Sequence, residues 1–312
     1  MRAIASYILK GPVQAVMSAS VPAMLSVSAP FVLKLLLIYF SGIAIALVAL
    51  RFGPRHSLMV LLMALVSSVA AGLALSMDSD GMLDLWNSVY LWVLIWISAI
   101  VLRSAESLAR MLEVIAVISV TTLLVFYSIV DDPISLGLKL LEPVQFLATE
   151  SVPDAPKIDM EKLRLDAAGF LPGSMMTYTV LGAMFCLFMA RSWQASLFNP
   201  AGFRQEFLSL RYSRSMGVTS LLLIAMLLFS SSFGEHAQLV VINISLVIGL
   251  LYIVGGLAVA HGLIAVQKKS PMLLVGLYVM LAIMTKVFVP LLMVLSLSDI
   301  WLDFRTRWFS GR

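Results

Sequence analysis

Long apolar runs, separated by short clusters of charged residues, recur along the whole chain. Nine of them are close to the roughly 20 residues that a helix needs to cross the hydrocarbon core of a bilayer. None alternates between polar and apolar positions as the strands of a membrane barrel do, so each run predicts a helix. The nine segments are 11–29, 31–50, 57–77, 85–102, 111–130, 171–190, 216–233, 238–260 and 271–297.

This pattern predicts an all-α fold, a polytopic bundle of eight or nine membrane-spanning helices. The first segment, 11–29, also resembles a secretory signal peptide, because Arg2 and Lys10 precede it and small residues end it. Pro30 would follow the cleavage point and disfavours cleavage, so we expect a retained first helix. No repeat or separate soluble domain is visible, and we treat residues 1–312 as a single integral membrane domain.

Basic residues are concentrated in alternate loops between the predicted helices. Ten of them follow the second, fourth, sixth and eighth segments, whereas the intervening short loops carry only acidic residues. Lysine and arginine are retained on the cytoplasmic side, so the sorting predicts a cytoplasmic N-terminus. Nine spans place the tail 301–312 outside, yet it contains Arg305, Arg307 and Arg312. Either the last segment does not cross simply or one span is miscounted.

Two connections are longer than simple turns. The extracytoplasmic loop region 131–170 holds eight of the 17 acidic residues, and we expect two short helices in it, 136–148, limited by Pro143, and 160–168. It is either a solvated cap or a lid over a substrate path. The cytoplasmic amphipathic loop 191–215 predicts a short helix after Asn199-Pro200, which is either an interfacial anchor or a docking site.

Composition narrows the class of protein. Hydrophobic residues make up 61% of the chain and charged residues 12%, with a mean hydropathy of +1.01. An ordinary soluble domain carries about 25% charged residues and could not bury this much apolar surface. A soluble enzyme, a disordered chain and a disulfide scaffold are excluded. The net charge of +4 follows from the cytoplasmic loops, and no basic stripe with interleaved aromatics predicts nucleic-acid binding.

Common catalytic and metal-binding motifs do not occur in the sequence. It has no phosphate-binding P-loop, no His-Glu-x-x-His and no Gly-x-Ser-x-Gly. The single cysteine, Cys186, can form neither an internal disulfide nor a cysteine metal site. We therefore expect no catalytic residue, no metal and no cofactor.

Polar residues within apolar segments are costly and mark candidate ligand or gating positions. Lys286 lies inside the last segment, and Pro290 lacks the N–H that would bond the Lys286 carbonyl. Tyr278 shares the face of Lys286 at helical spacing, and His261 and Asn243 lie in the preceding segment. The alternatives are a last segment in two pieces with Lys286 near an interface, an interfacial His261, and an Asn243 that links helices.

Two surfaces are candidates for contacts with a partner. One is an A-x-x-x-A face on the first segment, which permits close helix approach and is common in membrane bundles. The other is the apolar and basic surface of the short cytoplasmic helix. The candidate docking residues are Ala15, Ala19, Ala23, Phe203, Arg204, Phe207 and Arg211.

Four stretches carry a resemblance to a known family: NPAGFRQEF (199–207), GLAVAHGLIAV (256–266), LVGLYVML (274–281) and SDIWLDFRTRW (298–308). They resemble the YybS-like family of uncharacterised bacterial multi-pass membrane proteins, which implies the bacterial cytoplasmic (inner) membrane and no particular chemistry. The layout is also similar to the substrate-binding components of energy-coupling-factor vitamin transporters. There an A-x-x-x-A face packs on the energising partner, although those components usually have six helices.

The sequence favours a small-molecule binding or transport subunit without its own ATPase, with a cavity near Lys286 beneath 131–170. The alternative is a membrane scaffold that recruits a cytoplasmic or cell-envelope partner through 199–214, and a lipid-acting membrane enzyme comes third. A polar cavity lined by Lys286 and His261 would favour the ligand site. A dry core would favour the scaffold.

Overall fold

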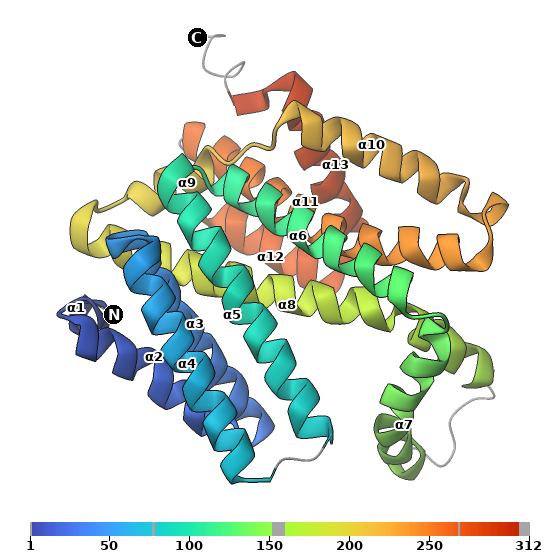
Figure 1. Cartoon of the computed structure of the whole chain (residues 1–312). Coiled ribbons are helices and arrows are strands. Elements are labelled where there is room, and N and C mark those ends of the chain that lie inside the picture. The colour runs from blue at the N-terminus through green and yellow to red at the C-terminus, as the bar shows by residue number, and fades with distance from the viewer. Residues whose placement is uncertain (1, 77–78, 152–159, 268, 306–312) are drawn as a thin grey trace. The chain divides into compact units, whose positions relative to one another are not determined.

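All regular structure in the computed structural model is helical over the described residues, which are 2–76, 79–151, 160–267 and 269–305 (Figure 1). Apolar segments form helices because backbone N–H and C=O groups in lipid must pair within their own segment. The predicted all-α class is confirmed. Lys268, one of the ten basic residues that follow the even-numbered segments, lies outside the described residues, as do Arg307, Arg312 and residues 152–159.

The order of the helices follows the order of the apolar segments. They are α1 (Arg2–Ile8), α2 (Pro12–Ser26), α3 (Phe31–Phe52), α4 (Pro54–Ala74), α5 (Ser79–Ala105), α6 (Leu108–Ile129), α7 (Pro133–Ser151), α8 (Met160–Phe198), α9 (Gly202–Leu208), α10 (Arg214–Leu228), the 3₁₀ turn η1 (Ser230–Ser232), α11 (Glu235–Val266), α12 (Met272–Ile283) and α13 (Thr285–Leu302).

Seven of the described helices are long and apolar enough to cross a membrane: α3, α4, α5, α6, α8, α11 and α13. The sequence predicted eight or nine. The difference lies in segments 11–29 and 216–233, where α2 and α10 have only 15 residues each. At 1.5 Å per residue such a helix is about 22 Å long, short of the ~30 Å hydrocarbon core.

The chain divides into two compact units. The first contains Met1–Ile115, Thr179–Arg214 and Tyr252–Arg312, and the second contains Ala116–Tyr178 and Ser215–Leu251. Helices α6, α8 and α11 each contribute residues to both units. Each unit is therefore assembled from segments that are far apart in the sequence.

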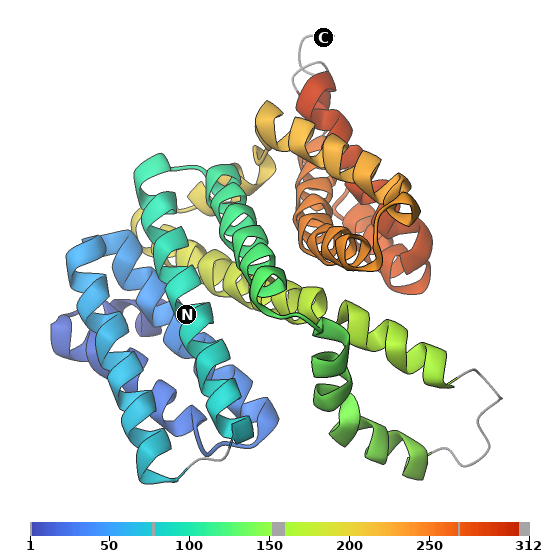
Figure 2. The same ribbon diagram turned by 45° about the vertical axis from the view of Figure 1, so that its right-hand side comes forward.

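The N-terminal part of the first unit is built around α3. Helices α2, α4 and α5 pack against α3, and α2, α3 and α4 lie side by side in both ribbon views (Figures 1 and 2). Every α3 residue from Ser41 to Leu50 is buried. The Ser41 hydroxyl donates a hydrogen bond to the Ala19 carbonyl of α2 at 2.7 Å. Small residues allow this close approach, because no bulky side chain separates the backbones.

Charged groups occupy opposite ends of this bundle. The Arg103 guanidinium of α5 donates hydrogen bonds to the Leu50 and Arg51 carbonyls at 2.7 and 2.6 Å. These carbonyls are among those that a helix leaves unpaired at its C-terminus. At the other end, the Lys34 ammonium lies 2.6 Å from the Asp84 carboxylate. The cytoplasmic N-terminus stays a prediction, and this separation agrees with it.

The predicted segment 271–297 is two helices instead of one. Helix α12 ends at Ile283, Met284 leaves the helical conformation (φ −114°, ψ 44°), and α13 begins at Thr285. Lys286 is thus the second residue of α13. The sequence left open whether Lys286 marks a ligand site within one long helix or a last segment in two pieces. The structure has the segment in two pieces.

Helices α12 and α13 run in opposite directions along α11. The Tyr278 hydroxyl of α12 is 3.3 Å from Nε2 of His261. On α13, Leu292 approaches so close to Gly256 that a β-carbon there would overlap the Leu292 carbonyl, and Arg305 lies against Gly262. The end of α13 therefore lies beside the C-terminal end of α11.

In the second unit, α7 continues through Pro143, where the sequence predicted only two short turns. A single lost backbone hydrogen bond does not end a helix. Asp132 caps α7, because its Oδ1 accepts a hydrogen bond from the Ser135 N–H at 3.0 Å. This bond lowers the pKa of the exposed Asp132 carboxyl. The short helix expected over 160–168 is the first part of α8.

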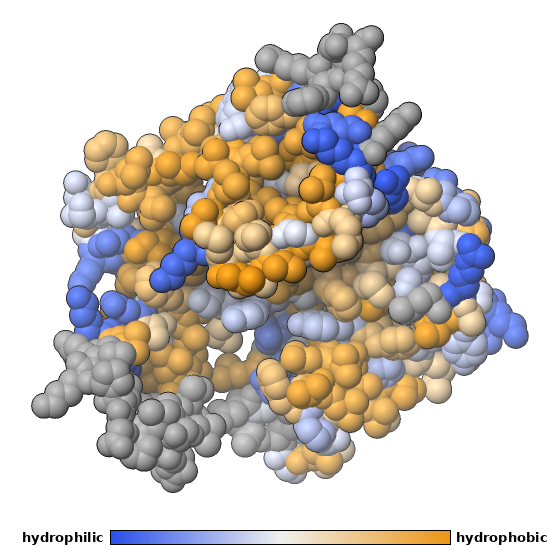
Figure 3. Space-filling model, turned by 180° about the vertical axis from the view of Figure 1, so that it is seen from behind, coloured by the Kyte–Doolittle hydropathy of each residue, from blue (hydrophilic) through white to orange (hydrophobic). Residues whose placement is uncertain are grey.

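Many outward-facing side chains of the long helices are apolar. Leu36, Leu73 and Ile129 are 62%, 72% and 73% exposed, and Figure 3 shows hydrophobic residues over much of one face. Soluble monomers rarely expose contiguous apolar surface of this kind. A lipid bilayer, into which such side chains can extend, is the environment that this surface fits.

Candidate functional site

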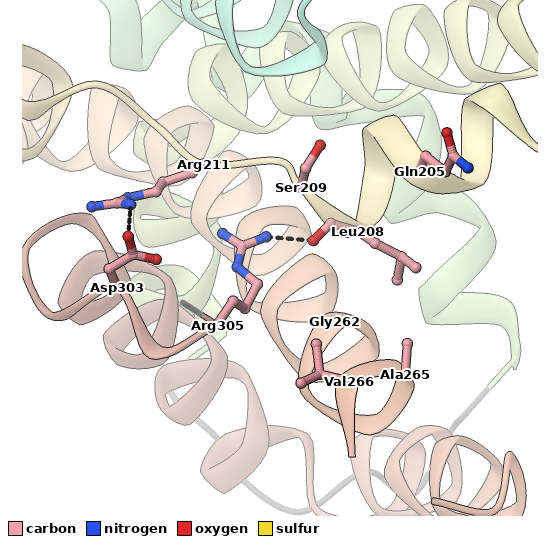
Figure 4. Close-up of a pocket in the computed structure, with 9 residues that line it drawn as sticks. All are labelled: Gln205, Leu208, Ser209, Arg211, Gly262, Ala265, Val266, Asp303 and Arg305. Carbon is pink, nitrogen blue, oxygen red and sulfur yellow. Dashed lines mark hydrogen bonds and ion pairs between the residues drawn. The ribbon is translucent and has the colours of Figure 1, made fainter. Parts of the chain in front are cut away.

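A pocket of about 480 Å³, here called the tail pocket, lies in the first unit. It forms where the end of α9, the end of α11 and the residues after α13 meet (Figure 4). The linker 209–213, which joins α9 to α10, closes one side. The lining residues are Gln205, Leu208, Ser209, Arg211, Gly262, Ala265, Val266, Asp303 and Arg305.

Arg305 fastens the end of the chain's helical part to the linker. Its guanidinium donates hydrogen bonds to the Leu208 and Leu210 carbonyls at 2.6 and 2.8 Å. It also pairs with the Asp299 carboxylate at 2.6 Å, and the two side chains are only 10% and 2% exposed. A buried charge is tolerated only when it is paired and hydrogen-bonded. The Asp299 carboxylate and the two carbonyls meet this requirement for the Arg305 guanidinium.

Arg211 makes a second bridge in the opposite direction, from the linker to the tail. Its guanidinium lies 2.6 Å from the Asp303 carboxylate and donates a hydrogen bond to the Ile300 carbonyl at 2.9 Å (Figure 4 shows the ion pair). Asp303 caps α13 in the left-handed conformation (φ 48°). The two bridges hold the linker and the tail at a fixed separation.

The linker itself is anchored beneath this network. Tyr212 is buried, and its ring packs against Tyr252 of α11 with centroids 5.4 Å apart. The Ser213 N–H donates a hydrogen bond to Oε1 of Glu113 at 2.6 Å. Burial raises the pKa of the Tyr212 hydroxyl well above its ordinary value, because a buried phenolate would lose its hydration.

The tail pocket offers both polar and apolar contacts. Gln205 and Ser209 are exposed and supply an amide and a hydroxyl, while Leu208, Ala265 and Val266 supply an apolar wall. The lining charges belong to Arg211, Asp303 and Arg305 and are already paired. Such a lining fits a small organic molecule with hydrogen-bonding groups. Among the described residues, no cluster of three His, Cys, Asp or Glu side chains could hold a metal ion.

Of the predicted ligand residues in the first unit, Tyr278 and His261 lie next to each other. Lys286 and Pro290 are exposed on α13, and neither lines the tail pocket. Tyr278 and His261 are brought together at 3.3 Å, and the His261 ring also packs against Phe207 at 5.7 Å between centroids. Neither Lys286 nor His261 lines the tail pocket, and a polar cavity shared by these two residues stays a prediction.

Asn243 is a link between helices of the second unit. Its side chain is fully buried, and Nδ2 donates to the Gly169 carbonyl at 2.9 Å while Oδ1 accepts from the Gly173 N–H at 2.5 Å. These two backbone groups would bond each other in an uninterrupted helix. Pro172 lies between them inside α8. Asn243 thus satisfies the backbone of α8 at a proline, where polar groups in lipid need partners.

The predicted docking residues are largely occupied by contacts within the chain. Ala15, Ala19 and Ala23 are buried on α2, which packs against α3 and α4. The predicted short helix is confirmed as α9, where Phe203 and Phe207 pack against each other and against Phe188. Arg211 bridges to the tail. Arg204 is exposed and forms no ion pair with a described residue.

Sequence reasoning missed the residues that organise the tail pocket. Asp299 and Arg305 are six residues apart, which is not a helical pairing distance. Gln205, Gly262 and Arg305 lie in the stretches that carry the family resemblance, 199–207, 256–266 and 298–308, but no spacing within these stretches indicated a shared pocket. The other available signal was the unexplained basic character of the tail, to which Arg305 belongs.

The fold and its surface define a polytopic helical membrane protein. Residues 149–300 match the model of a family described as "Predicted membrane protein (DUF2232)", which confirms the resemblance to a family of uncharacterised membrane proteins over that part of the chain. The match includes the α9 and α11 walls of the tail pocket but ends before Asp303 and Arg305. No curated protein and no solved structure matches the chain. The likeness to vitamin-transporter components stays a prediction.

Proposed function

We propose that the protein is a membrane subunit that binds a small organic molecule in the tail pocket. The observation that supports this function is the rigid frame of the pocket, in which Arg305 and Arg211 each join the linker to the tail. A binding site gains affinity when its walls are held in place before the ligand arrives. Binding, and no catalytic step, is the role proposed.

The proposed ligand has an apolar part and at least one hydrogen-bonding group. Leu208 and Val266 would contact the apolar part, and the Gln205 amide and Ser209 hydroxyl would orient the polar part. A pocket of about 480 Å³ falls within the usual range for small-molecule sites. If the subunit takes part in transport, a partner supplies the energy, since the sequence has no P-loop.

A pocket-filling variant tests this function. Ser209→Trp places an indole in the tail pocket at an exposed position, and the full-length protein in detergent is screened with a defined metabolite mixture for shifts in unfolding temperature. The control is Ser104→Trp, because Ser104 is also exposed and also donates to the carbonyl three residues earlier. We expect compounds that stabilise the unaltered chain and the control but not Ser209→Trp. Equal stabilisation of all three proteins would place binding elsewhere.

A scaffold role is the second candidate, and the exposed Arg204 favours it. This side chain projects from α9, whose phenylalanines fix the helix to α8, so a partner would meet a rigid basic surface. Arg204→Glu should abolish co-purification of an acidic partner, while Arg110→Glu, at another exposed basic position, should not. Equal co-purification with both variants would contradict docking at α9.

A further inference from the structure

A second pocket of the first unit, here called the N-terminal pocket, has a different character. It encloses about 370 Å³ between the α1–α2 connection, the end of α3 and the start of α4 (Figure 1 shows these elements). Its deep side is apolar, since Ala15, Val48 and Val60 line it and are buried. Its outer side carries two exposed cationic or ionisable groups, Lys10 and His56.

The charges around this pocket have no acidic counterpart nearby in the chain. Residues 1–77 contain no Asp or Glu at all. Lys10 and His56 form no ion pair with a described residue. Arg55, next to His56, is likewise exposed and unpaired among the described residues. An anion at the rim would therefore meet uncompensated positive charge.

The N-terminal ends of two helices add to the positive electrostatic potential at the rim of the pocket. Helix α2 begins at Pro12 and α4 at Pro54, and neither start has a side-chain cap. The first N–H groups of a helix lack intrahelical acceptors and carry partial positive charge. Pro12, which itself has no N–H, and His56 lie in the first turns of α2 and α4 and line the pocket, so both helix starts lie beside it.

The apolar side of the pocket continues onto exposed apolar surface. Phe52 and Met59 line the pocket and are 43% and 55% exposed. Met63, one turn further along α4, is also exposed, as is Val13 on α2. An acyl chain can follow this path from the pocket along α4, whereas a free inorganic anion would leave the apolar wall uncovered.

We propose that the N-terminal pocket binds a membrane phospholipid with an anionic headgroup. The phosphate lies between Lys10 and the start of α4, and the acyl chain lies against Val48, Met59 and Val60. The pocket between α4 and α5, lined by Gly72, Leu73 and Trp86 among others, has a comparable volume of about 300 Å³ but no basic lining residue. This pocket therefore lacks the cation that the proposal assigns to an anionic headgroup.

Native mass spectrometry of the full-length protein in detergent tests this assignment. Phosphatidylglycerol and phosphatidylcholine with identical acyl chains are titrated, and excess inorganic phosphate is added in a separate arm. We expect phosphatidylglycerol to bind at least about fivefold more tightly, since one basic residue near anionic lipid contributes on the order of fivefold. Inorganic phosphate should not displace it. Equal binding of both lipids, or displacement by inorganic phosphate, would overturn the proposal.

Three variants locate the site. Lys10→Gln should bring the two lipids to within about twofold of each other. Met59→Trp, which fills the pocket but keeps its cations, should weaken binding of both lipids at this site. Lys269→Gln removes an exposed lysine that lines neither this pocket nor the tail pocket, and it should retain the full preference. A Lys10→Gln protein that keeps the preference of the Lys269→Gln control would contradict the site.

Discussion

The tail pocket and the N-terminal pocket both contain positive charge, but the charge is used differently in each. In the tail pocket, Arg305 and Arg211 have acidic partners and donate to backbone carbonyls. In the N-terminal pocket, Lys10 has no ion-pair partner among the described residues. The first set of charges holds the chain together. The second set remains available to a ligand from outside.

Arginine and lysine suit these two uses of charge for different chemical reasons. Arginine presents several donors in a planar fork and can bridge a carboxylate and carbonyls at once, as Arg305 does. Lysine is a compact charge on a flexible stem and suits a headgroup that moves. The paired arginines therefore act within the chain, and Lys10, unpaired among the described residues, is the residue that the proposal assigns to a ligand.

The comparison depends first on both pockets lying on the same side of the membrane. Cysteines introduced at Ser104, at Lys269 and after Arg312 should all react with an impermeant maleimide from the cytoplasmic side. Met82→Cys, near the start of α5, should react only from the other side. Cys186 is fully buried and serves as an unreactive background. This all-or-none result is the largest effect expected, and a tail labelled from the Met82 side would mean that α12 and α13 cross as one span.

Arg305→Ala should cause the largest loss of stability. It leaves the buried Asp299 carboxylate unpaired and removes donors from the Leu208 and Leu210 carbonyls. Removing one partner of a buried ion pair typically costs about 3–5 kcal/mol. Unfolding in a denaturing detergent titration measures the change. A loss below about 1 kcal/mol would show that the Arg305 network is not a structural clamp.

Arg211→Ala should have a smaller effect than Arg305→Ala. The Arg211 and Asp303 side chains are 33% and 28% exposed, so solvent screens their attraction. We expect a loss of about 1 kcal/mol, which includes the hydrogen bond to the Ile300 carbonyl. The same titration measures it, and raised salt should reduce the difference from the unaltered chain. An effect equal to that of Arg305→Ala would contradict this ranking.

Lys10→Gln should leave stability unchanged to within about 0.5 kcal/mol, because the ammonium has no partner whose loss would matter. This is the smallest effect expected and the sharpest contrast with Arg305→Ala. The measurement is made in detergent without added lipid, since bound lipid stabilises the folded state by mass action. A large loss under these conditions would assign Lys10 a structural role.

Helical class and the positions of most long helices were predictable from the sequence. Apolar runs such as 31–50 and 238–260 correspond to α3 and α11, since lipid leaves the backbone no alternative to internal hydrogen bonding. Spans of marginal length were less predictable. In segments 11–29 and 216–233 the flanking turns shorten the helix, and hydropathy does not report a turn within an apolar run.

The break at Met284 shows most clearly where prediction of helix boundaries from the sequence fails. The sequence marked Lys286 and Pro290 as unusual but suggested a break at the carbonyl that Pro290 leaves free. In the structure Pro290 lies inside α13 and the chain turns at Met284 instead. The turn is favoured by contacts with α11, where Gly256 allows α13 to approach closely. Such contacts join residues that are distant in sequence.

Hydropathy was enough to predict a helical membrane bundle, and the positions of Lys and Arg were enough to divide its loops into two sets, because both properties act on each segment independently of its neighbours. Which cations have partners follows instead from the folded arrangement. Arg305 meets carbonyls nearly a hundred residues away, Asn243 completes the backbone of another helix, and Lys10 meets no acid among the described residues. Hydrogen bonds and ion pairs act over a few ångströms, so they depend on the folded arrangement that places their partners together.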